Sequence, residues 1–288
     1  MIVGLVSVKG SPGVTTTACA LGAAWPTDRK VLLVEADPFG GDLAAQFGAA
    51  PNVGLWSLLA ASRRGLGEGA VWEHCSFLPG GLPVLFGLTS TDQAIANEAA
   101  WPAVADALGS LDADIVIDAG RLLPQFAGGV RLLLDLAEVL IALCVPTLAG
   151  IVHLKASLPS LQGGPQSRRL LVLPTATKGF SSTGFSSTGY SSAEIASTLN
   201  VAVASPIPHD PKAAAAFGGA PTSIRIDKSK LAKWARASVN DLLSSSATHS
   251  SDFLDGPGDS APDMNLLAPS LGVNAQTLSA SPTAGMPR

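Results

Sequence analysis

The sequence predicts a doubly wound α/β fold in which a mostly parallel sheet carries helices on both faces. Near-continuous apolar runs, which are typical of strands buried on both faces, alternate along the chain with stretches of helical periodicity. A second observation concerns residues 9–16, a glycine-containing loop between the first apolar run and the first helical stretch. In such sheets ligands bind outside the carboxyl ends of the strands, which is where a loop of this kind lies.

The strands are expected where apolar and β-branched residues run together. These runs are Ile2–Val8, Val31–Glu35, Val84–Phe86, Asp114–Asp118, Val139–Val145, Leu170–Leu173 and Val201–Ile207. Helices are expected between them, at Thr15–Ala24, Leu55–Arg64, Thr91–Leu108, Leu148–Leu158 and Ser192–Leu199. The regular alternation of the two kinds of element favours the doubly wound arrangement.

A last, amphipathic helix is expected over Asp227–Leu243, with Asp227 as its N-cap. Its apolar face consists of Leu231, Trp234, Val239 and Leu242. Its polar face consists of Lys230, Lys233, Arg236 and Asn240. The predicted domain therefore covers residues 1–243. Within it, the Gly/Phe/Ser repeat at 179–192 is expected to form a flexible loop, and the Ser/Pro/Ala-rich residues 244–288 a disordered tail.

Composition narrows the class of protein. The chain has 288 residues, is 47% hydrophobic and carries a net charge of −4, so a large core is possible and a strongly basic nucleic-acid binder is disfavoured. The longest apolar run, Val139–Val152, contains Pro146 and is too short to span a bilayer. The N-terminus shows no basic region of a signal peptide. We expect a cytoplasmic protein with no integral membrane segment. The cysteines, in apolar surroundings and far apart, are expected to be free thiols: Cys19, Cys75 and Cys144.

The loop at 9–16 has the features of a phosphate-binding loop. It consists of Lys9, Gly10, Ser11, Pro12, Gly13, Val14, Thr15 and Thr16. The two glycines allow backbone N–H groups to converge on an anion, and the following helix adds a favourable dipole. Thr15 stands where a hydroxyl would reach Mg²⁺. In the usual pattern the preceding residue is a lysine that touches phosphate, but here it is Val14.

These residues resemble the deviant Walker A loop of the ParA/MinD family, in which an early lysine, here Lys9, precedes the glycines. Further segments resemble the family's motifs in the same order along the chain. They are residues 32–38 with the switch I Asp37, 114–120 with the Walker B Asp118, 137–147, and 206–210 with Pro208. Residues 35–48 are similar to the TadZ/CpaE-like branch, whose members localise pilus or secretion machinery.

The resemblance implies a fold of the P-loop NTPase class and a set of roles. ATP would bind at residues 9–16 and near Pro208, with Lys9 on phosphate across a nucleotide-dependent homodimer. Thr15 and Asp118 would hold Mg²⁺, and Asp37 would position the attacking water. The implied function is a positioning switch that recruits a protein partner from pilus, secretion or division machinery.

The chain departs from the family pattern at three positions. Val14 replaces the phosphate-loop lysine, Ser11 replaces a glycine, and Leu173-Pro174 stands where the family often has an adenine-reading asparagine. Removing a lysine charge from a phosphoryl-transfer site predicts weak or absent hydrolysis.

Several alternatives stay open. One is a pseudo-ATPase interaction scaffold without bound nucleotide. Another is a DNA-binding partition ATPase that uses the basic residues Lys228, Lys230, Lys233 and Arg236. Asp37, followed by Pro38, also fits a turn former. The threonines after Gly13 also fit a plain helix start.

Overall fold

The computed structural model describes the chain except at residues 51, 123–127, 163–168, 176–188, 222–224 and 252–288. Its contacts divide the chain into two units, and the first, Met1–Thr248, contains the elements discussed below except the last residues of the C-terminal helix. Most of the repeat loop and nearly all of the tail lie outside the described residues. The proposed domain end at 243 therefore stays a prediction, although the last helix continues to Ser251.

An eight-stranded sheet forms the centre of this unit, in the order β3-β4-β2-β5-β1-β6-β7-β8. Every neighbouring pair is parallel except β3 and β4, which are antiparallel. The strands are β1 (Ile2–Ser7), β2 (Val31–Glu35), β3 (Ser76–Phe77), β4 (Pro83–Leu85), β5 (Asp114–Arg121), β6 (Val139–Cys144), β7 (Arg169–Pro174) and β8 (Ala202–Val203). The doubly wound fold class is thus confirmed.

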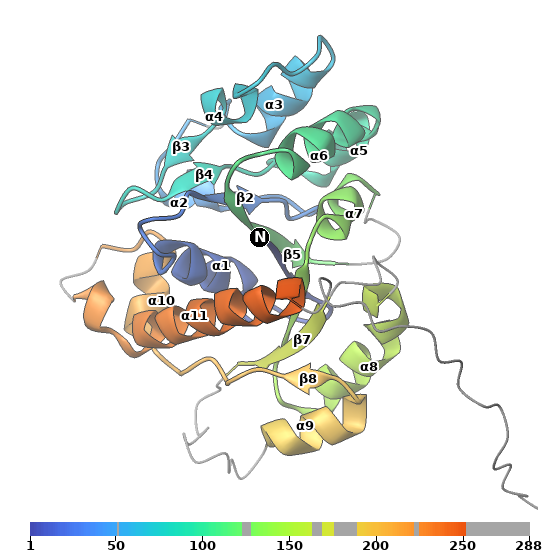
Figure 1. The fold of residues 1–288 in the computed structure, drawn as a ribbon, viewed down its shortest axis with the longest axis vertical. Coiled ribbons are helices and arrows are strands. Elements are labelled where there is room, and N and C mark those ends of the chain that lie inside the picture. Colours follow the sequence, from blue (N-terminus) through green and yellow to red (C-terminus); the bar gives the residue numbers. More distant parts are fainter. Residues whose placement is uncertain (51, 123–127, 163–168, 176–188, 222–224, 252–288) are drawn as a thin grey trace, which may run out of the picture. The chain divides into compact units, whose positions relative to one another are not determined.

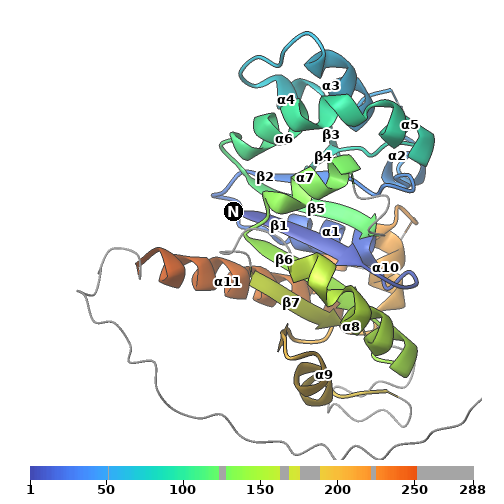
Figure 2. The same ribbon diagram turned by 90° about the vertical axis from the view of Figure 1, so that its right-hand side faces the viewer.

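Helices cover both faces of the sheet (Figures 1 and 2). One face carries α1 (Val14–Ala23), α2 (Leu43–Gln46), α10 (Pro211–Phe217) and α11 (Lys230–Ser251). The other carries α3 (Leu55–Ser62), α4 (Ala70–Glu73), α6 (Trp101–Gly109), α7 (Gly128–Asp135), α8 (Leu148–Gln162) and α9 (Ser192–Leu199). The helix α5 (Thr91–Ala96) leads into α6 through a 3₁₀ turn, Glu98–Ala100.

Two apolar cores result from the alternation of side chains along the buried strands. In β2, Leu32 and Val34 point to the core shared with α3, α6, α7 and α8, whereas Leu33 points to the core shared with α1 and α11. In β1, Val3 and Leu5 belong to this second core. Strands buried on both faces need apolar residues at consecutive positions, which is why the runs in the sequence predicted them.

The helix predicted over Thr91–Leu108 is wrong in one respect, because the chain breaks it at Asn97. The buried side-chain amide of Asn97 donates to the carbonyl of Gln93 (2.8 Å) and accepts from Arg63 (3.0 Å). Pro102 then lies in the first turn of α6, where its missing N–H has no cost. Side-chain competition for backbone groups therefore ends α5 early.

The predicted N-cap of the last helix is also wrong. Asp227 lies in a 3₁₀ turn, and α11 begins at Lys230. The hydroxyl of Ser229 accepts from the N–H of Ala232 (3.1 Å), and the carboxylate of Asp210 accepts from the N–H of Lys230 (2.9 Å). The amphipathic pattern itself is confirmed, because Leu231, Val239 and Leu242 are buried.

Candidate functional site

The carboxyl ends of three adjacent strands bring the predicted site residues together. In the sheet β5 lies between β1 and β2, and Asp118 of β5 is in register with Leu5 on one side and Glu35 on the other. The loop 9–16 follows β1, and Asp37 follows β2. These segments therefore meet at one edge of the sheet, as the doubly wound fold requires.

The loop leaves the start of α1 open to a ligand. Gly10 and Gly13 have φ values of 71° and 92°, in the left-handed region that glycine adopts readily. Gly13 is the N-cap of α1, and no side chain caps this end. The hydroxyl of Thr17 donates to the carbonyl of Gly13 (2.7 Å). The N–H groups of the first turn, with the helix dipole, are therefore available to an anion.

Within this loop the residues differ sharply in exposure. Val14 is 5% exposed and packs in the core with Leu5 and Ala18. Lys9, Gly10 and Ser11 are exposed, and Pro12, Thr15 and Thr16 are partly buried. The apolar side chain of Val14 thus packs in the core. Lys9 is the only positively charged residue of the loop 9–16.

Among the site residues, Asp118 has the environment best suited to binding a cation. Its side chain is fully buried, and Oδ1 accepts from the N–H of Gly120 (3.0 Å). Oδ2 has no hydrogen-bond partner of ordinary geometry among the described residues. Burial raises the pKa of Asp118 to about 7, with a smaller contribution from the charges of Glu35 and Asp37 and an opposing one from the hydroxyl of Thr15. A buried carboxylate oxygen without a hydrogen-bond partner is costly, so this atom is suited to binding a cation.

The pair Thr15 and Asp118 fits Mg²⁺. This cation binds through one or two protein oxygens and takes its other ligands from water and phosphate. In the described part of the chain, no cluster of three or more His, Cys, Asp or Glu side chains is arranged to hold a metal ion. When bound, Mg²⁺ would neutralise charge on phosphate and on the Asp118 carboxylate.

Asp37 lies against the backbone that follows Asp118. Its carboxylate accepts from the N–H of Phe39 (2.8 Å) and from the N–H of Arg121, and burial raises its pKa. The side chain is half-buried and touches Gly120. The bond to Phe39 is that of a turn, so both interpretations of Asp37, turn former and site residue, are compatible with its position.

Gly120 is the residue that makes this contact possible, and we predict a large effect of Gly120→Ala. Its φ is 53°, and an added Cβ would lie 1.8 Å from Oδ2 of Asp37. The left-handed conformation alone costs alanine roughly 1 kcal/mol, and displacement of the Asp37 loop adds to it. Urea unfolding should therefore show a loss well above 1 kcal/mol.

A matched control is Gly48→Ala, because Gly48 has a φ of 64° and open space around its Cβ position. Adding Asp37→Ala to Gly120→Ala should recover part of the loss, since it removes the clashing atoms. Equal losses for the two glycine variants would contradict the proposed contact.

Glu35 is a buried carboxylate, a candidate for a supporting role from the sequence, whose hydrogen-bond partners only the structure shows. Its oxygens accept from the N–H groups of Asp42 (2.8 Å), Leu43 (2.9 Å) and Gly87 (2.8 Å). Burial raises its pKa, and these three bonds act in the opposite direction. Glu35 thus fixes the segment that carries Asp37. The signal for it is an acidic residue at the end of an otherwise apolar strand.

Pro208 lies on the other side of β6 from the loop. It follows Ile207, which is bridged to Thr175 just beyond β7. The next acidic residue, Asp210, caps α10 by accepting from the N–H of Ala213 (3.2 Å). Leu173 is 2% exposed and packs in the core. It stands at the position where an asparagine would read adenine. The structure therefore shows no side-chain amide at that position.

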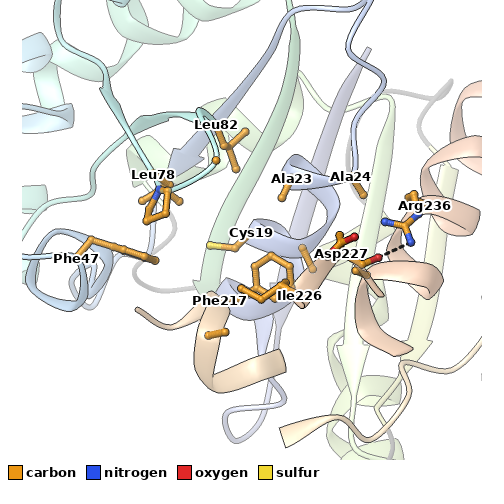
Figure 3. A pocket seen from close by; sticks show the side chains of 15 residues that line it. Cys19, Ala23, Ala24, Phe47, Leu78, Leu82, Phe217, Ile226, Asp227 and Arg236 are labelled. Carbon is orange, nitrogen blue, oxygen red and sulfur yellow. Dashed lines mark hydrogen bonds between the residues drawn. The ribbon is translucent and has the colours of Figure 1, made fainter. Parts of the chain in front are cut away.

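A separate apolar pocket of about 380 Å³ lies beside the later turns of α1 (Figure 3). Cys19, Phe47, Leu82 and Phe217 line it, and Arg236 lies at its edge, donating to the carbonyl of Asp227 (2.8 Å). None of the residues 9–16 contributes to it. Its apolar lining does not suit phosphate, so the pocket and the loop are distinct features.

Two further sequence expectations concern cysteines and membranes. Cys19, Cys75 and Cys144 are free, as predicted. Burial raises the pKa of the Cys144 thiol to about 11 and that of the Cys75 thiol to about 12, so neither is a reactive thiolate at neutral pH. Among the described residues, no helix combines the length and apolar character that crossing a bilayer requires.

Comparison with known proteins places this arrangement in a fold class. No sequence profile of a known family matches the chain, and no curated protein matches it. Solved structures do. A ParA family ATPase from Chlorobium tepidum TLS is 19% identical, with 84% of this chain and 98% of that chain covered and a TM-score of 0.66.

Two nucleotide complexes are also similar to the chain. The septum site-determining protein MinD from Pyrococcus horikoshii OT3, complexed with Mg-ADP, is 20% identical, covers 86% of this chain and 97% of its own, and has a TM-score of 0.66. Cobyrinic acid a,c-diamide synthase from Mycobacterium smegmatis, with bound ADP and magnesium, is 22% identical over 86% and 97% of the chains, with a TM-score of 0.55.

The fold is therefore that of the P-loop NTPases. Within this class it is of the ParA/MinD type, as the resemblance of the motifs predicted. At these identities the similarity concerns the fold, and the activity has to be argued from the residues of this chain.

Proposed function

We propose that the protein is a ParA/MinD-like positioning switch that binds MgATP at residues 9–16 and hydrolyses it weakly or not at all. The observation that carries the proposal is the Oδ2 atom of Asp118, buried without a partner beside the open N-terminus of α1. A cation at Asp118 and an anion at the helix N-terminus together describe a metal–phosphate ligand.

Different residues of the chain would bind different parts of MgATP. Backbone N–H groups of the loop would hold phosphate, and Thr15 with Asp118 would hold Mg²⁺. Lys9, exposed in the loop, would contact phosphate, and Asp37 would orient water if hydrolysis occurs. Pro208 would lie on the nucleoside side. Val14 supplies no charge, which is why we propose weak hydrolysis.

Recruitment of a protein partner is the proposed output of the switch. Bound nucleotide would favour a homodimer, whose surface would recruit a component of pilus, secretion or division machinery in the cytoplasm. The support is similarity of fold, including a solved MinC:MinD cell division protein complex from Aquifex aeolicus (18% identity, TM-score 0.62). The TadZ/CpaE-like branch is part of the same proposal.

Calorimetry of the full chain with MgATP and MgADP tests the proposal, with the oligomeric state measured in the same samples. We expect saturable binding that Lys9→Ala and Asp118→Ala each weaken, and a shift towards dimer with MgATP. Lys30→Ala is the control, because Lys30 is an exposed lysine just before β2, at the opposite edge of the sheet. Unchanged nucleotide affinity and oligomeric state in both site variants would refute the proposal.

A pseudo-ATPase scaffold is the second candidate, and the burial of Val14 favours it. Val14 is buried in the core, so its side chain brings no charge to this position. In that case the protein would dimerise and bind partners regardless of ATP. Absence of binding heat up to millimolar nucleotide would favour this candidate.

A further inference from the structure

We propose that Arg121 supplies, within the same chain, the positive charge that Val14 does not bring to the phosphates. This inference rests on the proposed function, because it takes MgATP as the ligand. The proposed binding residue lies outside the loop 9–16, at the end of β5.

A bulge at the end of β5 places Arg121 beside the loop. Leu5 is in register with Asp118, but Ser7, two residues later, is in register with Arg121, three residues later. The extra residue falls where Gly120 adopts a φ of 53°. Bulges of this kind redirect the strand and its next side chain. As a result Arg121 is paired with Ser7, the last residue of β1, from which the phosphate loop departs.

The backbone around Arg121 is fixed from two directions. Its N–H donates to the carboxylate of Asp37, and the N–H of the next residue, Leu122, donates to the carbonyl of Ser7 (2.9 Å). The hydroxyl of Ser7 also donates to the carbonyl of Gly120 (3.4 Å). A side chain carried on such a backbone starts from a defined position, which limits the entropy lost when it binds.

The guanidinium group of Arg121, in contrast, has no bonding partner among the described residues. The side chain of Arg121 is exposed, and it forms no hydrogen bond or ion pair with the described residues. Two acidic groups at this edge, Glu35 and Asp37, use their oxygens for backbone N–H groups. An arginine held at an anion-binding edge without a partner suits phosphate, which it binds in a bidentate way.

The negative charge at the site also favours a second positively charged side chain in addition to that of Lys9. Once a cation is bound at Asp118, the carboxylates of Glu35, Asp37 and Asp118 bring negative charge to the edge where a polyphosphate would add more, and Val14 is neutral. Mg²⁺ offsets part of this repulsion and Lys9 another part. Arg121 follows Asp118 by three residues, so it is placed to offset the remainder.

Lys9 and Arg121 are distinguishable by experiment. If Lys9 acts across a dimer, its contribution depends on protein concentration, whereas a contact within one chain does not. Binding of MgATP, MgADP and Mg-tripolyphosphate to the full chain would be measured by calorimetry at protein concentrations below and above dimer formation. The variants are Arg121→Gln, Arg121→Lys and, as control, Arg64→Gln, whose exposed arginine follows the C-terminal end of α3.

We expect Arg121→Gln to weaken MgATP and tripolyphosphate binding roughly tenfold to a hundredfold at both concentrations, the loss typical of one charge-assisted bond. Arg121→Lys should recover part of the affinity, and Arg64→Gln should bind like the wild type. Thermal melting without ligand should be similar in all four proteins. If Arg121→Gln melts lower, Arg121→Lys decides: a loss of affinity as large as that of Arg121→Gln, in a lysine variant that melts like the wild type, would overturn the inference.

The two proposals fail in different ways. Wild-type affinity in Arg121→Gln, together with weakened binding in Lys9→Ala, would overturn the role of Arg121 and leave the nucleotide site in place. Absence of saturable binding by the wild type would overturn both.

Discussion

Asp118→Asn should raise the stability of the ligand-free protein at pH 8, although it removes a residue of the proposed magnesium site. In the folded protein the pKa of Asp118 is about 7 because the carboxyl is buried, whereas an unfolded chain has an aspartate pKa near 3.9. The fold therefore prefers the protonated form. Asparagine keeps the acceptor for the N–H of Gly120 and introduces no charge.

The effect of Asp118 on the pH dependence of stability has a defined sign. Below about pH 4 the carboxyl is protonated in both states, so the folded protein bears no penalty from it. As the pH rises from 4 to 7 the unfolded chain loses this proton and the folded protein keeps it, so stability falls. The penalty grows by about 1.4 kcal/mol per pH unit and levels off above pH 7, on the order of 4 kcal/mol in total. Because the side-chain amide of the new asparagine must also fit into this buried position, we expect Asp118→Asn to recover only about 1–2 kcal/mol of the unfolding free energy.

The matched control lies at the other end of the same strand. Asp114 is also buried, and burial opposes its ionisation, but hydrogen bonds from Arg29, the amino group of Met1 and Trp25 outweigh this and hold its pKa well below the usual range. Asp114→Asn should therefore lower stability at pH 8. Its effect should shrink as the pH falls below the unfolded pKa towards the lower folded one.

Thermal unfolding at pH 5 and pH 8, without nucleotide or magnesium, measures both effects. We expect Asp118→Asn to melt several degrees above the wild type at pH 8, with a smaller difference at pH 5. Added MgATP should raise the melting temperature of the wild type more than that of the variant. A lower melting temperature for Asp118→Asn at pH 8 would show that the buried carboxylate is already compensated in the ligand-free protein.

The pattern of apolar runs was sufficient to predict the central strands, because residues buried on both faces must be apolar at consecutive positions. Val31–Glu35 was predicted with its observed bounds, as was the helix Ser192–Leu199. The helices α2, α4, α7 and α10 and the two-residue β3 were missed, since a period is hard to see in elements of two to eight residues. Asn97 interrupts a helix through contacts with Gln93 and Arg63 that no local pattern reveals.

The candidate site was predicted only where its residues are close in sequence or end a strand. The loop 9–16 and Asp118 belong to this group. The hydrogen bonds of Glu35 could not be predicted, because the N–H groups from which it accepts are brought to it by a turn and by a neighbouring strand. The position of Arg121 depends on a one-residue bulge, which the sequence does not show. The burial of Val14 could likewise be known only from the packing of α1 against β1.

Val14→Lys should have opposite effects on the ligand-free and the nucleotide-bound protein. Val14 is 5% exposed and packs in a core with Leu5 and Ala18, so a lysine there loses apolar contacts and brings a charge to the positive end of a helix dipole. We expect the ligand-free variant to lose about 1–3 kcal/mol of unfolding free energy. With MgATP the ammonium gains phosphate oxygens as partners, and we expect affinity to rise about tenfold or more.

Val14→Met is the control that separates length from charge, because methionine is unbranched and of similar length but neutral. Calorimetry, thermal melting with and without MgATP, and phosphate release would be measured for both variants. Only the lysine variant should gain affinity and turnover if the loop, Thr15 and Asp118 still form a working site.

The result also decides between the proposed switch and the scaffold. If both variants lose stability and neither responds to MgATP, the core around α1 has adapted to valine and the loop no longer accepts phosphate. If the lysine variant regains turnover while Lys9→Ala abolishes its binding, then one substitution separates this chain from an active ATPase. In that event the wild-type valine is best explained as a means of keeping bound nucleotide from being consumed, since the carboxylates and backbone groups of the site are still in place.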